Sequence, residues 1–287
     1  MMREHKKTTA KVNRSLSGNI FAFLLLIILG SFMIMPMIFV VSNAFKPLDE
    51  LFIYPPRLFV RHPTMDNFVD MFNIMSQSWV PFSRYIFNTV FITVIGTFGH
   101  LVIASLAAFA FAKHKFKGNN FFFSIIVLSL MFTPSVTGIP TYIIVTKLGI
   151  LDTYWAVLLP ALQYSLGIYL MKQFMEGIPD AILESARMDG AGEYRIWFKI
   201  AMPMVKPAWI TLIILMIQSL WNMISPYTYS EELKTLPQSL SQILAGGIAR
   251  QGVSAAVSLF MIIVPLVVFI FSQTQIIETM NASGIKE

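Results

Sequence analysis

The sequence predicts an all-α integral membrane protein with six membrane-spanning helices. Of its 287 residues, 56% are hydrophobic and only 13% are charged, whereas soluble globular chains carry about 25% charged residues. Six apolar stretches reach the length of about 20 residues that a helix needs to cross a bilayer. None of these six stretches contains Asp, Glu, Lys or Arg. Because unpaired sheet edges do not survive in hydrocarbon, each stretch is expected to be a helix.

Taken in order, the chain divides into tails, spans and connectors. A basic N-terminal tail, 1–17, precedes the first span, 18–44, which is too long for a signal-peptide core and is expected to be retained. A loop over 45–84 leads to a core over 85–277, and a tail over 278–287 follows. Within the core, the five further spans are expected at 85–112, 120–145, 153–171, 208–227 and 253–277.

The distribution of Lys and Arg predicts the orientation. Fourteen of the 21 lie in the two tails and in the connectors after the second and fourth spans, and seven lie in the other connectors. Because cytoplasmic loops carry the excess of positive charge, both termini and the block 179–207 are expected in the cytoplasm. The loops 45–84 and 230–252 are then external. The net charge of +6 is attributed to this topology and not to a nucleic-acid partner.

Proline interrupts several of the predicted spans, and each proline removes a backbone donor and bends its helix. The densest irregular region is 134–140, with the sequence PSVTGIP. Simple curvature around a bundle and a role in a transport pathway remain equally open for these positions. The prolines concerned are Pro36, Pro134, Pro140, Pro160 and Pro265.

Several kinds of chemistry are missing from the sequence. The spans hold no carboxylate or Arg of the kind that ion-coupled transporters use. The chain has no Walker A pattern, no catalytic constellation within its spans and no Cys, and its four His share no metal-ligand spacing. We therefore expect no enzyme, no metal site and no bound cofactor. If the protein drives uphill transport, the energy must come from a partner.

The block 179–207 is the evident place for such a partner to bind. Pro179 and Asp180 are typical of a helix start, and Gly190 is typical of a helix end. A second short helix is expected over 193–201, stopping near Pro203, so that the two helices form an L on the membrane surface. An ordinary interfacial amphipathic connector is the alternative.

The spacing within this block carries a family resemblance. Glu184-Ser185-Ala186, Gly190 and Ile200-Ala201-Met202-Pro203 resemble the EAA motif of binding-protein-dependent ABC importer permeases, with Ser185 and Met202 as mild departures. Further segments are similar to the MalG-type subunit of carbohydrate importers. They are Phe45-Lys46-Pro47, Asn88-Thr89, 106–112, Lys147-Leu148-Gly149, Thr235-Leu236-Pro237 and 282–286.

The resemblance implies the type I importer fold and a role for each matching segment. In the family, the EAA element docks on a cytoplasmic ATPase, which implies this role for Glu184, Ser185, Ala186, Asp189, Gly190, Ala191 and Pro203. The tail residues Gly284, Ile285 and Lys286 would also reach the ATPase. The external residues Ala245, Gly246 and Gly247 would probe the sugar cleft of a binding protein.

The resemblance also implies the partners and the location. This chain would work beside a MalF-type second permease subunit, two cytoplasmic ABC ATPase subunits and an extracytoplasmic solute-binding protein. ATP and Mg would be bound by the ATPase subunits and not by this chain. The complex would sit among the lipids of the bacterial cytoplasmic membrane and import a carbohydrate, most simply an oligosaccharide. Permeases for amino acids, peptides, phosphate or glycerol-phosphate share the EAA element, and a scaffold that recruits a soluble protein is the rival from another class.

Six polar or aromatic side chains of the fourth and fifth spans are candidates for a substrate path, because sugar sites combine apolar walls with a few polar groups. Four of them recur at i, i+3, i+4 and i+7 and are expected on one helix face. Hydrogen bonding between helices is the competing explanation. The six are Gln163, Tyr164, Gln218, Trp221, Asn222 and Ser225.

Overall fold

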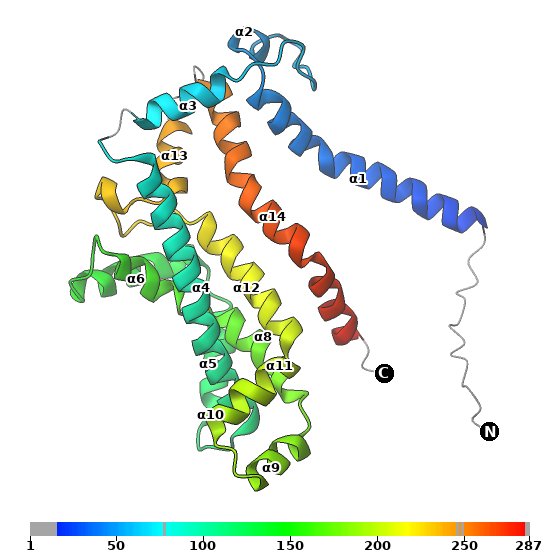
Figure 1. Cartoon of the computed structure of the whole chain (residues 1–287), viewed down its shortest axis with the longest axis vertical. Helices are drawn as coiled ribbons and strands as arrows, with labels where there is room; N and C mark the ends of the chain where they lie inside the picture. The colour runs from blue at the N-terminus through cyan, green and yellow to red at the C-terminus, as the bar shows by residue number, and fades with distance from the viewer. Residues whose placement is uncertain (1–15, 77–78, 245–246, 248–249, 285–287) are drawn as a thin grey trace.

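The structure is a computed structural model that describes residues 16–76, 79–244, 247 and 250–284, and all regular secondary structure within these residues is helical (Figure 1). The longest helices are α1 (Leu16–Ala44), α4 (Phe82–Lys113), α12 (Lys206–Trp221) and α14 (Gln251–Gly284). The helices that accompany them in the bundle are α5 (Asn119–Ser129), α6 (Pro134–Lys147), α7 (Tyr154–Ala161) and α8 (Ser165–Glu176).

The remaining elements lie at the two ends of the molecule, as Figure 1 shows. At one end are α2 (Leu48–Leu51), α3 (Asp66–Ser76), the 3-10 turn η2 (Glu231–Leu233) and α13 (Leu236–Leu244). At the other end are α9 (Asp180–Met188), α10 (Glu193–Ile196), the π-helical turn η1 (Trp197–Ala201) and α11 (Met202–Met204).

The all-α membrane fold predicted from the sequence is confirmed, with two spans bent. Four helical segments are long and apolar enough to cross a membrane, namely 17–44, 82–113, 154–176 and 251–273. The number rises to as many as six if each of two bent pairs is one span. The bend is 111° between α5 and α6 and 84° between 193–204 and 206–221.

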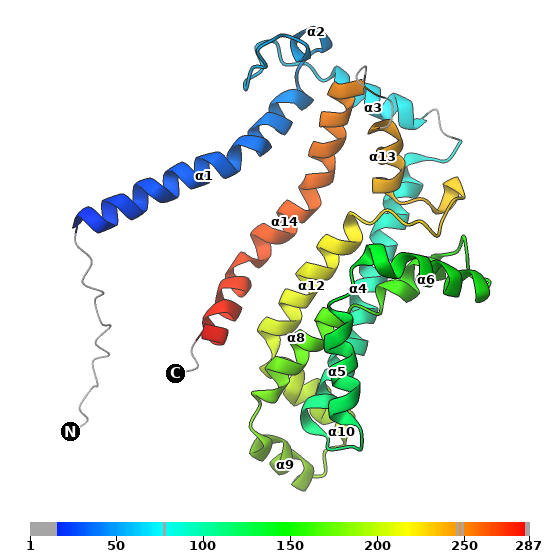
Figure 2. The same cartoon turned by 180° about the vertical axis from the view of Figure 1, so that it is seen from behind.

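The third predicted span, 120–145, is the clearest departure from the expected spans. Helix α5 ends at Ser129 and α6 begins at Pro134, after Thr133 in an extended conformation with ψ of 154°. Proline disfavours a helical residue before it and is well suited to the first turn of a new helix. Helix α6 therefore lies crosswise to α4 (Figures 1 and 2).

The fourth and fifth spans differ from the prediction at their ends. The helical segment predicted at 153–171 continues to Glu176 and is interrupted between Ala161 and Ser165. The span predicted at 208–227 is helical only as far as Trp221. Residues 222–227 instead begin the connector that leads to η2.

Helix α4 lies at the centre of the bundle and packs against α8 and α12. The buried core between these helices includes Ala104, Ala108, Met171, Leu212 and Met216. Small side chains allow the close helix packing that membrane bundles favour. A Cβ added at Gly96 of α4 would lie only 2.7 Å from Cδ1 of Leu220, so α4 and α12 approach closely at this point.

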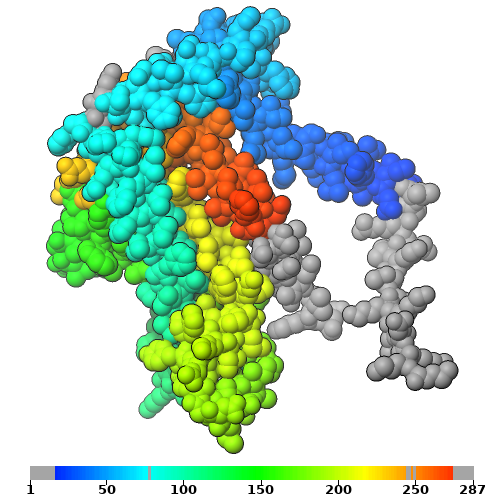
Figure 3. All heavy atoms as spheres, viewed as in Figure 1, coloured from blue at the N-terminus to red at the C-terminus, as the bar shows by residue number. Residues whose placement is uncertain are grey.

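Helix α1 projects away from the bundle (Figure 3). No residue of its most apolar 18-residue stretch is buried. Its C-terminal end is held by a buried polar cluster. The Lys46 ammonium donates to Asn43 Oδ1 at 2.8 Å and to the carbonyl of Arg57. The Asn67 amide donates to the carbonyls of Ala44 and Lys46 at 3.0 and 2.7 Å. This cluster fixes the direction in which α1 departs.

Candidate functional site

The first part of the site is the end of helix α9, which closes on Gly190. This glycine has a φ of +80°, in the left-handed region that glycine adopts without steric cost. The Gly190 N–H donates to the carbonyl of Arg187, and the Ala191 N–H donates to the carbonyl of Ala186, both at 3.0 Å. These two bonds are the Schellman arrangement that satisfies the last carbonyls of a helix. The spacing from Ala186 to Gly190 and Ala191 is therefore the spacing of one helix end.

The second arm of the block is longer than predicted. It starts after Gly192 and runs from Glu193 to Met204 as one helical segment, with the π turn η1 inside it. This helix was expected to stop near Pro203, and it ends one residue later, at Met204. Pro203 lies directly after the π turn.

Ion pairs tie the two arms to each other and to the end of α4. The Arg187 Nε donates to Glu193 Oε1 at 2.8 Å, and His114 Nε2 lies 3.3 Å from Glu193 Oε2. Lys113 pairs with Asp180 at 2.7 Å. The hydrogen bond from the Arg187 guanidinium lowers the pKa of Glu193, and the hydrogen bond from Lys113 lowers the pKa of Asp180. Arg187 is therefore engaged within the block.

The outer surface of this block combines exposed charged side chains with large exposed apolar ones. Glu184 is exposed and makes no side-chain hydrogen bond or ion pair with the residues that the structure describes. Met188, Tyr194 and Phe198 are 89%, 79% and 64% exposed. Leu183 and Ile196 are buried and join the core of the bundle. Such a surface suits docking to a protein, since interface cores are rich in Met and aromatic residues.

The other predicted residues of this block fall on the same surface or just behind it. Ser185, Asp189, Gly190 and Pro203 are exposed, while Ala186 and Ala191 are half-buried against the core. The structure thus brings all of these residues together at one end of the molecule (Figure 1).

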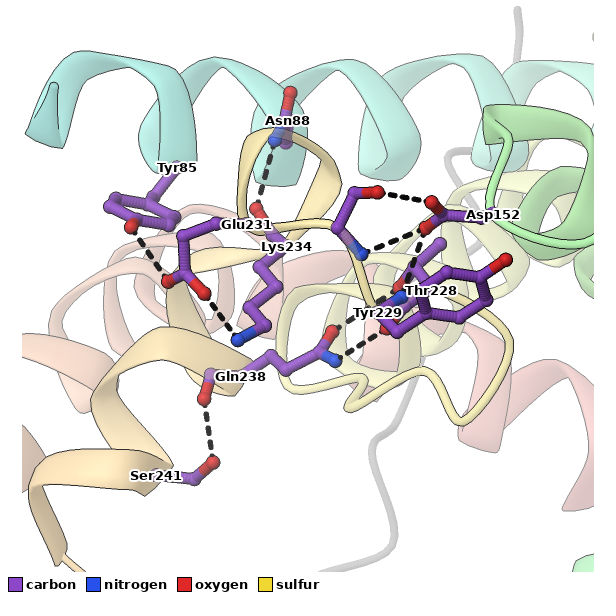
Figure 4. A network of polar contacts seen from close by, with 10 residues as sticks. Tyr85, Asn88, Asp152, Thr228, Tyr229, Glu231, Lys234, Gln238 and Ser241 are labelled. Carbon is purple, nitrogen blue, oxygen red and sulfur yellow. Dashed lines mark hydrogen bonds and ion pairs between the residues drawn. The ribbon is translucent and has the colours of Figure 1, made fainter. Parts of the chain in front are cut away.

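A polar network lies at the opposite end, where the connector 222–235 crosses α4 (Figure 4). The buried Asn88 amide donates to the carbonyls of Glu232 and Lys234 at 2.8 and 2.9 Å, and its Oδ1 accepts from the Tyr154 hydroxyl at 2.7 Å. Thr89 Oγ1 accepts from the Leu236 N–H at 2.8 Å. The segments Asn88-Thr89 and Thr235-Leu236-Pro237, which are far apart in the sequence, are therefore in contact.

Asp152 anchors the other side of this connector. Its Oδ1 accepts from the N–H groups of Tyr229 and Ser230 at 3.0 and 2.9 Å, and the Ser230 hydroxyl donates to its Oδ2. Burial disfavours the charged form of Asp152, but the hydrogen bonds outweigh it and hold the pKa below the ordinary value. Sequence reasoning missed Asp152, because nothing local distinguishes it from any loop aspartate.

Glu231 closes the network from within the connector. Its Oε1 accepts from the Tyr85 hydroxyl at 2.8 Å, and its Oε2 pairs with Lys234 (Figure 4). The connector is thus held from α4, from the turn before α7 and from its own side chains.

Comparison with known proteins identifies the family. Residues 59–281 match the model described as binding-protein-dependent transport system inner membrane component. The chain belongs to this family. It is 29% identical over 262 residues to the arabinooligosaccharides transport system permease protein AraQ of Halalkalibacterium halodurans, covering 88% of this chain and 91% of that protein.

A further relative and a solved structure are similar to most of the chain. A polygalacturonan/rhamnogalacturonan transport system permease protein, YtcP, of Bacillus subtilis is 29% identical over 210 residues, covering 73% of this chain and 70% of that protein. The fold is similar, with a TM-score of 0.76 and 24% identity, to a chain of a bacterial ABC transporter involved in the import of the acidic polysaccharide alginate. That match covers 91% of this chain and 98% of the other.

The sequence resemblance implied that two further segments contact a binding protein and an ATPase. Ala245 and Gly246 lie outside the described residues, and Gly247 is exposed with a φ of +77°. Gly284 ends α14, and Ile285 and Lys286 lie outside the described residues. The roles of these residues stay predictions.

The six candidates for a substrate path do not share one surface. Helix α12 ends at Trp221, so Ser225 lies beyond it, and the prediction of four residues on one helix face is wrong for Ser225. The buried Ser225 accepts from the Tyr227 N–H at 3.2 Å. Trp221 is also buried, and its Nε1 donates to the carbonyl of Met261 in α14 at 3.2 Å, which is the hydrogen bonding between helices that was the competing explanation.

The other four candidates remain accessible. Gln218 is half-buried and Asn222 is exposed, with the Asn222 amide donating to the Gln218 carbonyl at 3.2 Å. Gln163 is exposed in the break between α7 and α8, and Tyr164 beside it is half-buried.

Proposed function

We propose that this chain forms half of the translocation path of an ATP-driven, solute-binding-protein-dependent importer of oligosaccharides or polysaccharide fragments. The observation that carries the proposal is the surface formed by α9 and the second arm. Glu184, which makes no side-chain hydrogen bond or ion pair with the described residues, and Met188 are exposed on α9, and Tyr194 and Phe198 are exposed on the second arm. The scaffold of this surface is fixed by the Gly190 helix end and by the ion pair between the two arms.

The coupling role of this surface follows from what the chain lacks and what the block offers. The sequence contains no Walker A pattern, so ATP and Mg would be bound by two cytoplasmic ATPase subunits. We place both termini and the block on the cytoplasmic side, from the Lys and Arg distribution. Glu184 would form a charge-assisted contact with a basic residue of the ATPase, and the half-buried Ala186 would allow close seating.

The remaining partners would cover the other surfaces. A second, MalF-type permease subunit and lipid would cover the exposed apolar side chains of α1 and α14, of which Phe32, Met33 and Phe271 are examples. A loaded binding protein would dock at the outer end, where the connector is held by Asn88 and Asp152. Energy would then enter at one end of the molecule and substrate at the other.

A carbohydrate substrate is supported by the names of the relatives. One is described as a permease for arabinooligosaccharides and another as a permease for polygalacturonan and rhamnogalacturonan. Accessible side chains along the bundle include Gln163, Tyr164, Gln218 and Asn222, and such aromatic and amide groups are suited to sugars.

Reconstituted uptake tests the proposal. The chain would be co-produced with a second permease subunit, an ATPase and a binding protein encoded near it, and reconstituted into liposomes. The probes would be arabinooligosaccharides, oligogalacturonides and alginate oligosaccharides, with amino acids, dipeptides and glycerol-phosphate as comparison solutes. We expect uptake of at least one oligosaccharide that requires both ATP and the binding protein. Uptake of only the comparison solutes would refute the carbohydrate assignment, and uptake without ATP would refute the ATP-driven mechanism.

A further inference from the structure

His100 is the only side chain within the six predicted spans that ordinarily titrates near neutral pH, and the function proposed above gives it no role. It lies on α4, is completely buried, and its Nδ1 is 2.9 Å from the carbonyl oxygen of Leu162. Since a carbonyl only accepts hydrogen bonds, Nδ1 carries the proton and donates. The imidazole of α4 thus reaches across to a neighbouring span.

Leu162 lies at the interruption of that span. Helix α7 ends at Ala161, directly after Pro160, and α8 begins at Ser165. A break of this kind takes backbone carbonyls out of the regular helical pattern. In hydrocarbon an unsatisfied carbonyl is costly, so broken helices persist where neighbouring groups supply the donor. His100 supplies it to Leu162.

Gly167 on α8 provides the space that the imidazole occupies. A Cβ added to Gly167 would overlap Nε2 of His100 and would lie 3.1 Å from its Cδ2 and 2.8 Å from Cδ1 of Leu212. Nε2 is buried and makes no hydrogen bond with the described residues. The ring of Tyr164 meets the imidazole edge-on, with centroids 5.7 Å apart. The imidazole is therefore enclosed by the break on one side and by the glycine on the other.

We propose that His100 is a positioning residue that holds the α7–α8 break in place and thereby sets the position of Gln163 and Tyr164 in the wall of the translocation path. That these two residues line a path rests on the function proposed above. The position of the break itself does not depend on that function. The two parts can therefore be tested separately.

A single engineered cysteine tests the position of the break. Because the sequence has no Cys, Gln163→Cys gives this chain a single thiol. The rate at which this chain reacts with a water-soluble maleimide reports where residue 163 lies in the assembled complex. We expect His100→Leu and Gly167→Ala each to change this rate by about tenfold, a size typical of coupling within one contact network, because His100 contacts Leu162 and Tyr164 on either side of residue 163. His100→Asn should leave it within about twofold, because its amide can occupy the place of Nδ1 and keep the donor.

Two matched variants sharpen the test. His100→Gln carries its amide one bond further out, toward Gly167, so it should behave like His100→Leu although it is equally polar. His100→Asn combined with Gly167→Ala should restore the alkylation rate, because the shorter side chain removes the overlap with the imidazole. The remaining close contact is with the flexible end of Leu212, which can move away at little cost. Equal rates in all variants, or a double variant no better than Gly167→Ala alone, would overturn the proposal. Each variant is first checked for complex assembly, and the rescue arm keeps the test decisive if His100→Leu fails to assemble.

Uptake separates the two parts of the proposal. With the oligosaccharide that the wild-type complex imports, His100→Leu should raise the KM for the loaded binding protein or alter the preference among chain lengths by about tenfold, with His100→Asn near wild type. Two results would overturn the path assignment. One is a Gln163→Cys thiol that does not react when the rest of the complex is wild type. The other is a maleimide reaction rate that changes in the His100 variants without any change in KM or in the chain-length preference. If the wild-type complex imports none of the probes, the proposed function fails while the alkylation result still stands.

Discussion

The Ala191 N–H donates to the carbonyl of Ala186 at 3.0 Å, so these two alanines close helix α9 across Gly190. The bond explains why an alanine, a glycine and a second alanine occur at this spacing in the block. The glycine supplies the left-handed conformation, and the small side chains on both sides pack against the core. The shape of the exposed surface around Glu184 therefore depends on one helix end.

Replacement of Gly190 tests this dependence. Gly190→Ala should destabilise the block by about 1 kcal/mol, the cost of a left-handed conformation for a residue with a Cβ. Gly192→Ala is the matched control, because Gly192 has a φ of −72° and an added Cβ meets nothing within 4 Å. Thermal unfolding of the reconstituted complex should separate the two variants, and equal effects would show that the positive φ is unimportant.

Glu193 should contribute much more to the stability of the chain than Glu184, although both lie in the same block. Glu193→Gln should lower stability by about 0.5–1 kcal/mol, because it weakens the partly exposed pair with Arg187. Glu184→Gln should change stability much less, since Glu184 makes no side-chain hydrogen bond or ion pair with the described residues and interacts with Arg187 only by longer-range charge attraction. Thermal unfolding of the isolated chain in detergent measures both effects. A comparable stability loss on Glu184→Gln would mean that this carboxylate is engaged within the chain.

Asn88 should be essential for holding the external connector. Asn88→Ala removes three part-buried hydrogen bonds, which should cost about 3 kcal/mol in total. Asn73→Ala is the control, because its side chain is exposed and bonds to none of the described residues. Protease cleavage within 226–235 should accelerate in the first variant only, and slow cleavage in both would contradict the assignment.

Asp152 gives the connector a defined pH dependence. Its pKa lies below the ordinary value of 3.8, so its contribution to stability is fully present above pH 3.8 and is lost as the pH falls through the lowered pKa. Asp152→Asn should therefore be less stable by about 1–2 kcal/mol at neutral pH, with no change in this difference between about pH 5 and 8. The difference should shrink below pH 3.8. A difference that varied across the neutral range would point to another titrating group.

Local patterns predicted what depends on local sequence. The apolar stretches predicted the helical segments, and the run from Pro179 to Gly190 predicted a helix start and stop that the structure places at Asp180 and Met188. The sequence showed an irregular region at 134–140. It did not show the angle between α5 and α6, because the direction of α6 depends on packing against other parts of the chain.

Long-range contacts could not be predicted in the same way. Asn88-Thr89 and Thr235-Leu236-Pro237 were both singled out, but one sequence contains no signal that pairs a side chain with a carbonyl 144 residues away. The sequence showed that His100 is the only His in the six predicted spans. It did not show that the imidazole contacts the carbonyl of Leu162. Ser225 was misplaced because helical spacing was assumed to continue past the point where α12 ends.

The central claim is that the surface around Glu184 couples this chain to an ATPase. The most direct test is binding-protein-stimulated ATP hydrolysis by the reconstituted complex, measured together with uptake for Glu184→Lys and for the control Gly192→Ala. We expect Glu184→Lys to abolish the stimulation and uptake while the isolated chain keeps its stability, and Gly192→Ala to behave as wild type. Undiminished stimulation and uptake in Glu184→Lys would contradict the claim.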